Sequence, residues 1–384
     1  MLTAATKTSL CLILTICLVT GARLSAAAPP VPAAPQVAGT GHLLIDPHSG
    51  YVISEFNADT RLEPASITKI MTGYLVFREL EQGGLKPSDQ VLISEKAWRT
   101  PGSRMFVEVG TRVTLEDLLR GMVVQSGNDA SVALAEHVAG SEEAFADLMN
   151  EHARRLGMDN THFVNATGLP DPNHYTTPHD IARLTAAVIR EFPKWYELYS
   201  EKEFTWNDIR QPNRNTLLWR DASVDGVKTG HTESAGYCLV ASAERDGMRL
   251  ISVVMGTASE AERASETLSL LNYGFRFFET HRLYGAGDAL TATRVWKGER
   301  EQVALGVTRD LFVTIPRRRY DELQARTEIR PLIEAPVAQG DELGHLIVEL
   351  DGASVAQAPL VALAGVPDGG LWRTAVDSVL MLLE

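Results

Sequence analysis

Apolar and polar positions follow a strand-like pattern near the start of the chain and a helical pattern after it. His42–Asp46 and Tyr51–Phe56 are apolar runs separated by a turn containing proline and glycine, which predicts a β-hairpin. One helix is expected to begin at Thr114, three residues before Asp117, because this spacing is similar to a capping box. The period of the apolar residues predicts helices over 67–81, 114–122, 128–138, 142–156 and 177–191.

Strand patterns return after this helical region. Gly236–Glu244 and Leu250–Met255 are β-rich, and Asp246-Gly247 between them favours a tight hairpin turn. A further helix is expected over Ser259–Thr280. Because strands stand at both ends of a helical middle, the sequence predicts an α+β domain whose antiparallel sheet is built from both ends of the domain.

No long helical period appears beyond about Leu283. Short alternating segments at 303–315, 330–334 and 346–350 predict a small all-β domain. The last segment, 367–384, contains a Gly-Gly break and then Leu371–Glu384, whose apolar residues share one helical face. This helix is too short to span a bilayer. We expect it to lie on a membrane surface, with Trp372 at the headgroup level, rather than to pack on its own protein.

The first 27 residues have the pattern of a signal peptide. Lys7 gives a positive start, Leu10–Val19 is a short apolar run, and Ser25-Ala26-Ala27 provides small residues for cleavage. The alternative is a membrane-spanning anchor, which would need a longer apolar run. Lipoprotein processing at Cys17 is disfavoured because Ile16 before it is bulky. We therefore expect an exported protein.

Length and composition bound the remaining possibilities. The chain has 384 residues, so two domains are expected, over 38–282 and 283–366, after a flexible leader rich in proline and alanine over 28–37. The formal net charge of −13 argues against a nucleic-acid partner, because phosphate binding needs a cationic surface. Cleavage of the signal peptide leaves Cys238 as the one cysteine, so no internal disulfide is expected.

The first candidate motif is Ser66-Ile67-Thr68-Lys69, at a predicted helix start. Residues three apart share a helix face, so the amine of Lys69 can reach the hydroxyl of Ser66. Serine becomes a good nucleophile when a base takes its proton, and lysine is a base only if burial or a second cation lowers its pKa. Alone this motif is weak, because an exposed helix start has the same pattern.

The second motif is Ser126-Gly127-Asn128, between two predicted helices. Its hydroxyl can relay a proton, and its amide can hold a substrate carbonyl. These residues are also ordinary in turns and helix caps. The motif gains weight only together with the others.

The third motif is Lys228-Thr229-Gly230, followed by His231. Lys228 is expected to be the second cation that lowers the pKa of Lys69, Thr229 to bind a terminal carboxylate, and Gly230 to let substrate lie against a strand edge. The structural alternative is a surface β-turn. Three motifs in this order, each at a structural break, favour a serine acyl-transfer enzyme.

The segments around these motifs resemble the low-molecular-mass penicillin-binding D-alanyl-D-alanine carboxypeptidases. The resemblance extends to the downstream β domain and the amphipathic tail, so it covers the whole mature chain. It implies a penicillin-binding, serine β-lactamase-like domain with an antiparallel sheet and a helical subdomain, and a periplasmic location with peripheral attachment to the outer face of the inner membrane. The most similar segments are Pro64–Thr72, Gly121–Ser131, Asp225–Thr232, Gly236–Ala243 and Gly274–Phe278.

The resemblance also implies an activity. The enzyme is expected to remove the terminal D-Ala from the pentapeptide stem of peptidoglycan through an acyl-enzyme, to be acylated by β-lactam antibiotics, and to need no cofactor or metal. The residue roles that it implies are Ser66 as the acylated residue, Lys69 as base, Ser126 and Asn128 in the proton network, Lys228, Thr229 and Gly230 along the substrate strand, His231 in shaping the pocket, and Arg214 and Arg263 near the substrate carboxylate.

One segment departs from the family pattern. The stretch between Trp98 and Met105 is short compared with the enterobacterial members, and it borders the predicted active site. We expect this difference to affect the rate of deacylation and not the type of reaction.

Three other functions fit the sequence less well. A serine β-lactamase needs a carboxylate that activates the deacylating water, and Glu203–Asn207 has a suggestive spacing, but it lies far beyond Ser126 and has Trp206 where leucine is usual. A non-catalytic scaffold is disfavoured by the intact serine and lysines. A metalloenzyme is disfavoured because no His-Glu-x-x-His motif occurs. We expect surface or capping roles for His137, His152, His162, His174 and His179.

Overall fold

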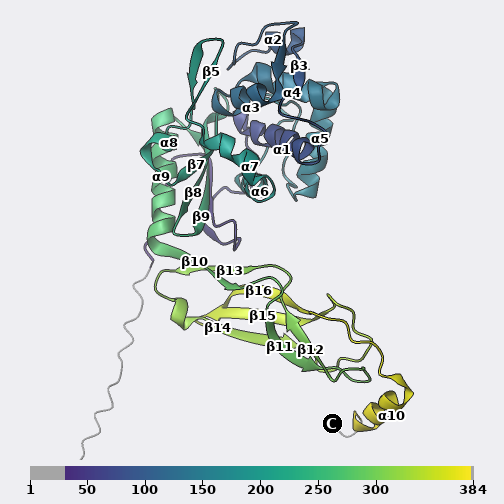
Figure 1. Cartoon of the computed structure of the whole chain (residues 1–384). Coiled ribbons are helices and arrows are strands. Elements are labelled where there is room, and N and C mark those ends of the chain that lie inside the picture. Colours follow the sequence, from purple (N-terminus) through teal and green to yellow (C-terminus); the bar gives the residue numbers. More distant parts are fainter. Residues whose placement is uncertain (1–30, 382–384) are drawn as a thin grey trace, which may run out of the picture. The chain divides into compact units, whose positions relative to one another are not determined.

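The computed structural model describes residues 31–381 of the chain (Figure 1). The predicted signal peptide lies outside the described residues. No helix within residues 31–381 is long and apolar enough to cross a membrane.

The first domain is built on a five-stranded antiparallel sheet, as the sequence predicts. Its first strand pairs with a strand more than 200 residues later, with Leu43 opposite Val253, so both ends of the domain contribute to one sheet. The strands, in sheet order, are β2 (Val52–Phe56), β1 (Gly41–Ile45), β9 (Met248–Thr257), β8 (Gly236–Arg245) and β7 (Val224–Thr232). Because β7 is at one edge, its outer side is available to a ligand.

The five helices predicted between residues 67 and 191 are confirmed to within two residues. Thr114, Ser141 and Thr177 each accept a hydrogen bond from the backbone N–H three residues on, which explains where these helices begin. The long helices before the last strands are α1 (Lys69–Glu81), α3 (Leu115–Val124), α4 (Asn128–Ala139), α5 (Glu142–Arg155) and α6 (Pro178–Glu191).

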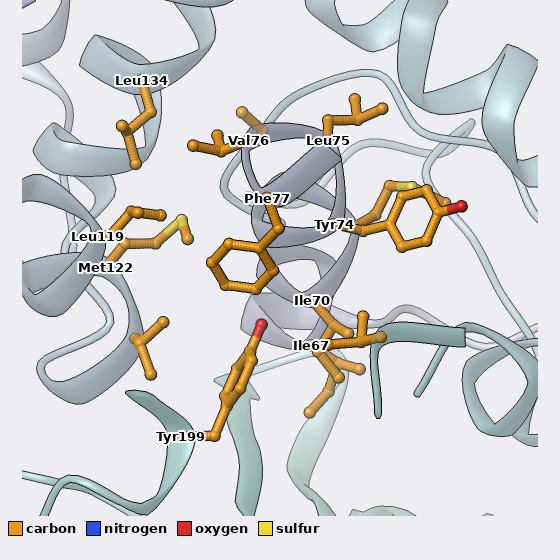
Figure 2. Close-up of a cluster of buried hydrophobic side chains, with 14 of the residues drawn as sticks. Ile67, Ile70, Tyr74, Leu75, Val76, Phe77, Leu119, Met122, Leu134 and Tyr199 are labelled. Carbon is orange, nitrogen blue, oxygen red and sulfur yellow. The ribbon is translucent and has the colours of Figure 1, made fainter. Parts of the chain in front are cut away.

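The core of this helical region surrounds α1. Figure 2 shows Phe77 of α1 among side chains from several elements, with Met122 and Leu119 of α3 on one side and Tyr199 below it. The rings of Phe77 and Tyr199 meet edge to face with centroids 6.2 Å apart. Burying a side chain of this size contributes about 2 kcal/mol. The helix that begins at Lys69 is therefore held firmly in place.

Several short elements have no counterpart in the sequence prediction, because segments of three to five residues show no period. One of them, the hairpin of β5 and β6, contains the Glu203–Asn207 spacing. These elements are β3 (Gln90–Leu92), α2 (Glu95–Arg99), β4 (Arg112–Thr114), α7 (Pro193–Tyr196), η2 (Glu197–Ser200), β5 (Glu203–Trp206), β6 (Ile209–Pro212) and α8 (Leu217–Arg220). The short helix η1 (Ala65–Thr68) lies at the predicted helix start, directly before α1.

The helix predicted over Ser259–Thr280 ends three residues earlier than expected. Helix α9 (Glu260–Phe277) is followed directly by β10 (Phe278–Tyr284), which pairs with β13 (Leu311–Pro316). The helical pattern continues past Phe277, but the ladder to β13 satisfies the backbone of the next residues as a strand.

The second domain is all-β, as predicted. Buried side chains of its five-stranded sheet form a small core that includes Leu305, Leu346 and Leu360. The segment 330–334 is not a strand, because β14 ends before it, and only Glu334 forms an isolated bridge, with Trp296. In sheet order the strands are β11 (Ala289–Arg294), β12 (Gln302–Gly306), β16 (Ala353–Ala362), β15 (Glu342–Leu350) and β14 (Gln324–Ile329), with η3 (Tyr320–Glu322) before β14 and α10 (Gly370–Leu380) after β16.

Candidate active site

The first motif forms a tight turn into α1. Ser66 lies in η1, and Lys69 is the first residue of α1. The neighbouring side chain of Ile67 is fully buried and anchors this turn in the core. Lys69 Nζ lies 2.9 Å from Ser66 Oγ, so the predicted contact between base and nucleophile is present.

The amine of Lys69 is buried and surrounded by three oxygens. It donates to Asn128 Oδ1 over 2.7 Å and to the carbonyl oxygen of Thr167 over 2.7 Å. A neutral amine has two N–H groups and one lone pair. Because the two carbonyl oxygens accept both N–H groups, the lone pair of the neutral amine is left for the hydroxyl of Ser66. This geometry suits a general base.

The electrostatic surroundings favour the neutral form of Lys69. Burial, followed by the positive charge of Arg214, lowers the pKa of Lys69 to about 7, against the opposing effect of Asp129. Burial is one of the two causes expected from the sequence, but the second cation that acts on Lys69 is Arg214 and not the predicted Lys228. Lys228 is itself buried on β7, and burial together with the charge of Lys69 holds its pKa well below the usual range.

The second motif lies between α3 and α4. Ser126 has a left-handed backbone with φ of 67°. Its hydroxyl is buried and has no hydrogen-bond partner among residues 31–381. The side chain of Asn128 is engaged on both sides, since its Nδ2 donates to the carbonyl of Pro101 over 2.6 Å while its Oδ1 binds Lys69. Ser126 is therefore the group in this turn that is free to contact a ligand.

The short segment before Met105 and the residues that follow it are held by hydrogen bonds to the start of α4. The buried carboxylate of Asp129 accepts hydrogen bonds from the backbone N–H groups of Met105, Phe106 and Val107 over 2.9, 2.9 and 3.3 Å. The backbone N–H of Asn128 also donates to the carbonyl of Ser103 over 2.7 Å. One residue pair of α4 thus fixes the path of this loop.

The third motif lies on β7, at the edge of the sheet. A Cβ atom on Gly230 would lie 3.0 Å from the carbonyl oxygen of Pro64 and 3.2 Å from Cβ of Ala65. Glycine is therefore needed so that β7 can approach the turn carrying Ser66, a different reason from the substrate clearance expected from the sequence. The ring of His231 stacks on Tyr237 of β8 with centroids 3.9 Å apart.

These elements surround a cavity of about 460 Å³. Lys69 and Lys228 do not line it, because both amines lie buried behind its wall. The other predicted site residues all do, and the full lining is Ser66, Gly102, Ser103, Ser126, Asn128, Thr167, Gly168, Leu169, Arg214, Thr229, Gly230, His231, Thr232, Tyr237, Glu260 and Arg263.

The two predicted arginines reach the cavity from different elements. Arg263 comes from α9, is buried, and donates to the carbonyl of Gly230 over 3.2 Å. Its guanidinium also lies 5.5 Å from the centre of the Tyr237 ring. Arg214 is exposed on the segment before α8 and lines the same cavity. Two guanidinium groups beside a strand edge can bind a carboxylate.

One wall of the cavity was missed at the sequence level. Asn165 Oδ1 accepts from the backbone N–H groups of Thr167 and Gly168, which turns the carbonyl of Thr167 toward Lys69. Gly168 has φ of 82°, and a Cβ there would lie 1.8 Å from the carbonyl oxygen of Ala65. The spacing of asparagine and glycine is a turn signal, and it carries no sign of catalysis.

Two of the five histidines do not have the surface or capping role expected of them. His174 is buried, with Nε2 lying 2.8 Å from Thr68 Oγ1, and its Nδ1 accepts from the backbone of Val164. Burial lowers the pKa of His174 to about 4, so it is neutral. His152 is buried beside Arg78. No group of three or more potential metal ligands occurs in the described part of the chain.

Glu203 does not supply the cavity carboxylate that a β-lactamase would need. Glu203 is exposed on β5, forms an ion pair with Arg210 of the same hairpin, and does not line the cavity. The arrangement as a whole therefore supports acyl transfer from a ligand that carries a carboxylate to the hydroxyl of Ser66.

Comparisons with known proteins agree with this geometry. The family model for D-alanyl-D-alanine carboxypeptidase matches residues 28–259, and the model for the C-terminal domain of penicillin-binding protein 5 matches residues 278–368. D-alanyl-D-alanine carboxypeptidase DacA of Escherichia coli strain K12 is 42% identical over 362 residues, which cover 92% of this chain and 90% of that protein.

Solved structures give the same result. The crystal structure of penicillin-binding protein 5 from Haemophilus influenzae matches with a TM-score of 0.86 and 43% identity, covering 88% of this chain and 100% of that one. Penicillin-binding protein D2 from Listeria monocytogenes, in its ampicillin-bound form, matches with a TM-score of 0.59 and 28% identity over 64% of this chain and 100% of that one.

Proposed function

Because the chain belongs to the D-alanyl-D-alanine carboxypeptidase family and is a serine-type carboxypeptidase, we propose that its substrate is the pentapeptide stem of peptidoglycan, from which it removes the terminal D-Ala. The single observation that carries this proposal is the hydrogen-bonding of Lys69. Its amine has two carbonyl acceptors and lies 2.9 Å from Ser66 Oγ, beside a cavity with two arginines.

The reaction follows from these positions. Ser66 Oγ attacks the carbonyl carbon of the penultimate D-Ala while Lys69 takes the hydroxyl proton. Backbone N–H groups of Ser66 and of the β7 edge near Thr232 stabilise the oxyanion. The peptide bond then breaks, and the amine of the terminal D-Ala leaves with a proton delivered through Lys69 and Ser126. Water hydrolyses the ester on Ser66 and restores the free enzyme.

The terminal carboxylate binds on the side of the cavity that is formed by β7 and the two arginines. Thr229 and His231 of β7, with Arg214 and Arg263, offer hydrogen-bond donors and positive charge there. A β-lactam carries a carboxylate next to a reactive amide, so it presents the same two groups. We therefore propose that β-lactam antibiotics acylate Ser66.

A test must separate this function from a β-lactamase and from a non-catalytic scaffold. Purified protein is incubated with a peptide ending in D-Ala-D-Ala, and released D-Ala is measured. Intact-mass spectrometry after penicillin then maps the adduct. Release of D-Ala and a stable adduct on Ser66 are expected, both lost in Ser66→Ala. Rapid penicillin turnover without a lasting adduct would favour the β-lactamase, and no release at all would favour the scaffold.

The membrane attachment is also a proposal. Helix α10 contacts the β domain through a polar group, since the buried carboxylate of Asp377 accepts from the backbone N–H of Lys297 over 2.6 Å. Its apolar residues face outward, with Leu371 94% and Trp372 83% exposed. An exposed apolar face with a tryptophan suits the interface of a bilayer. We place the enzyme in the periplasm, held by α10 on the outer face of the inner membrane.

A further inference from the structure

One carboxylate lies among the cations of the cavity. Glu260 is the first residue of α9, and it is the only acidic residue among the described residues that line the cavity. Its Oε1 accepts a hydrogen bond from Arg263 Nη2 over 3.3 Å. The family reaction does not require a carboxylate at this place, so the role of Glu260 needs a separate explanation.

The two partners of this ion pair differ in their freedom to move. The side chain of Arg263 is 5% exposed and is held by the carbonyl of Gly230 and by the ring of Tyr237. The side chain of Glu260 is 65% exposed. An incoming carboxylate therefore meets a buried guanidinium held by two further contacts and a solvent-exposed Glu260, and the exposed group is the one that can be displaced.

A ligand carboxylate that binds Arg263 must either replace Glu260 or share the guanidinium with it. Both alternatives cost free energy, because the first breaks an ion pair and the second brings two like charges together. A ligand without a carboxylate at this position does not meet this cost. Glu260 therefore affects how strongly the enzyme prefers ligands with a C-terminal carboxylate over ligands without one.

Resting on the proposed function, we propose that Glu260 is a specificity-determining residue that competes with the terminal carboxylate of the substrate for Arg263. It weakens the preference of this enzyme for ligands with a free carboxylate over ligands in which that group is neutral. Because the pair is largely exposed on one side, the effect is modest, about three- to five-fold in kcat/KM.

The experiment compares two N-acylated L-Lys-D-Ala-D-Ala tripeptides, one with a free C-terminal carboxylate and one with a C-terminal amide. In Glu260→Gln, kcat/KM for the free acid is expected to rise about three- to five-fold through a lower KM, while the value for the amide stays unchanged. The salt dependence of kcat/KM for the free acid should also become steeper, because the cavity is then more cationic.

Glu262→Gln is the matched control, since it removes the same charge from the same helical turn. Glu262 accepts from the backbone N–H of Ala258 and does not line the cavity, so its variant should leave the ratio of the two peptides unchanged. A fall in kcat/KM for the free acid in Glu260→Gln would overturn the inference, as would an equal change for both peptides. Failure of the wild type to release D-Ala or to form the Ser66 adduct would instead refute the proposed function.

Discussion

The side-chain oxygen of Asn128 lies 2.7 Å from Nζ of Lys69 and takes one of its N–H groups. This contact connects the second motif to the base of the first motif. It orients the amine toward Ser66, and it does so with a neutral acceptor. The neutrality matters because a carboxylate at this position would favour the charged ammonium form.

The pH dependence of acylation should therefore report on Lys69. Its pKa of about 7 means that the neutral, base-competent fraction grows as the pH rises through 7, so the acylation rate with penicillin should rise over the same range. Asn128→Asp should raise the pKa of Lys69 and reduce acylation at pH 7 by about ten-fold or more. Rate measurements from pH 5 to pH 10 check both points.

The decisive feature of this variant is recovery at alkaline pH. If only the protonation of Lys69 has changed, acylation by Asn128→Asp should approach the wild-type rate once the pH exceeds the new pKa. A rate that stays low at every pH would show that the substitution distorts the site instead, for example through the lost hydrogen bond to Pro101.

Gly168 should be far less replaceable than other glycines with the same backbone. Gly168 and Gly140 have φ of 82° and 81°, but a Cβ on Gly168 would strike the carbonyl of Ala65, whereas a Cβ on Gly140 meets nothing within 4 Å. Gly140→Ala should lower the free energy of unfolding by about 1 kcal/mol, from backbone strain alone. Gly168→Ala should cost about 3 kcal/mol or more.

Denaturant unfolding measures both variants, and penicillin labelling adds a second readout for Gly168→Ala. The carbonyl of Thr167 next to it holds the amine of Lys69, so a shift of this wall should also slow acylation. Equal losses of stability in the two variants would show that the backbone around Gly168 shifts at little cost and that close packing against Ala65 is unimportant.

The sequence predicted the parts of the site that depend on local spacing. Ser66 and Lys69 are three residues apart, and one helical turn is enough to bring them together. The carbonyl of Thr167 could not be predicted, because it comes from a loop 98 residues from Lys69, and a backbone oxygen leaves no trace in residue type. The role of Arg214 in lowering the pKa of Lys69 was missed for a related reason, since only the tertiary fold brings residue 214 near residue 69.

In the fold, too, the features set by local sequence were predicted and those set by distant parts of the chain were not. Helices of ten or more residues were predicted because their apolar period repeats several times, as in α6 (Pro178–Glu191). The β5–β6 hairpin was missed because each strand has four residues. The end of α9 at Phe277 was misplaced because pairing with β13 decides it, and that partner lies more than 30 residues further on.

Asp129 should be important for stability although it does not line the cavity. Its carboxylate is buried and accepts backbone hydrogen bonds from Met105, Phe106 and Val107. Asp129→Ala leaves these N–H groups without an acceptor, so the free energy of unfolding should fall by about 2–4 kcal/mol. Asp117→Ala removes a carboxylate at the start of α3 whose one side-chain partner within residues 31–381 is Thr114, so it should cost less. Thermal and denaturant unfolding of the two variants give the comparison, and equal losses would argue against a special role for Asp129.

Attachment to membranes should depend on the outward face of α10. Leu371→Glu places a charge where 94% of the side chain is exposed, so it should leave the fold and the release of D-Ala intact while weakening binding to vesicles of anionic phospholipid. Leu332→Glu is the matched control, because it makes the same change at a leucine of the β domain that is 52% exposed and lies outside α10. Co-sedimentation of the mature protein with vesicles measures both. Equal binding by the wild type and Leu371→Glu would mean that the apolar face of α10 serves something other than a lipid surface.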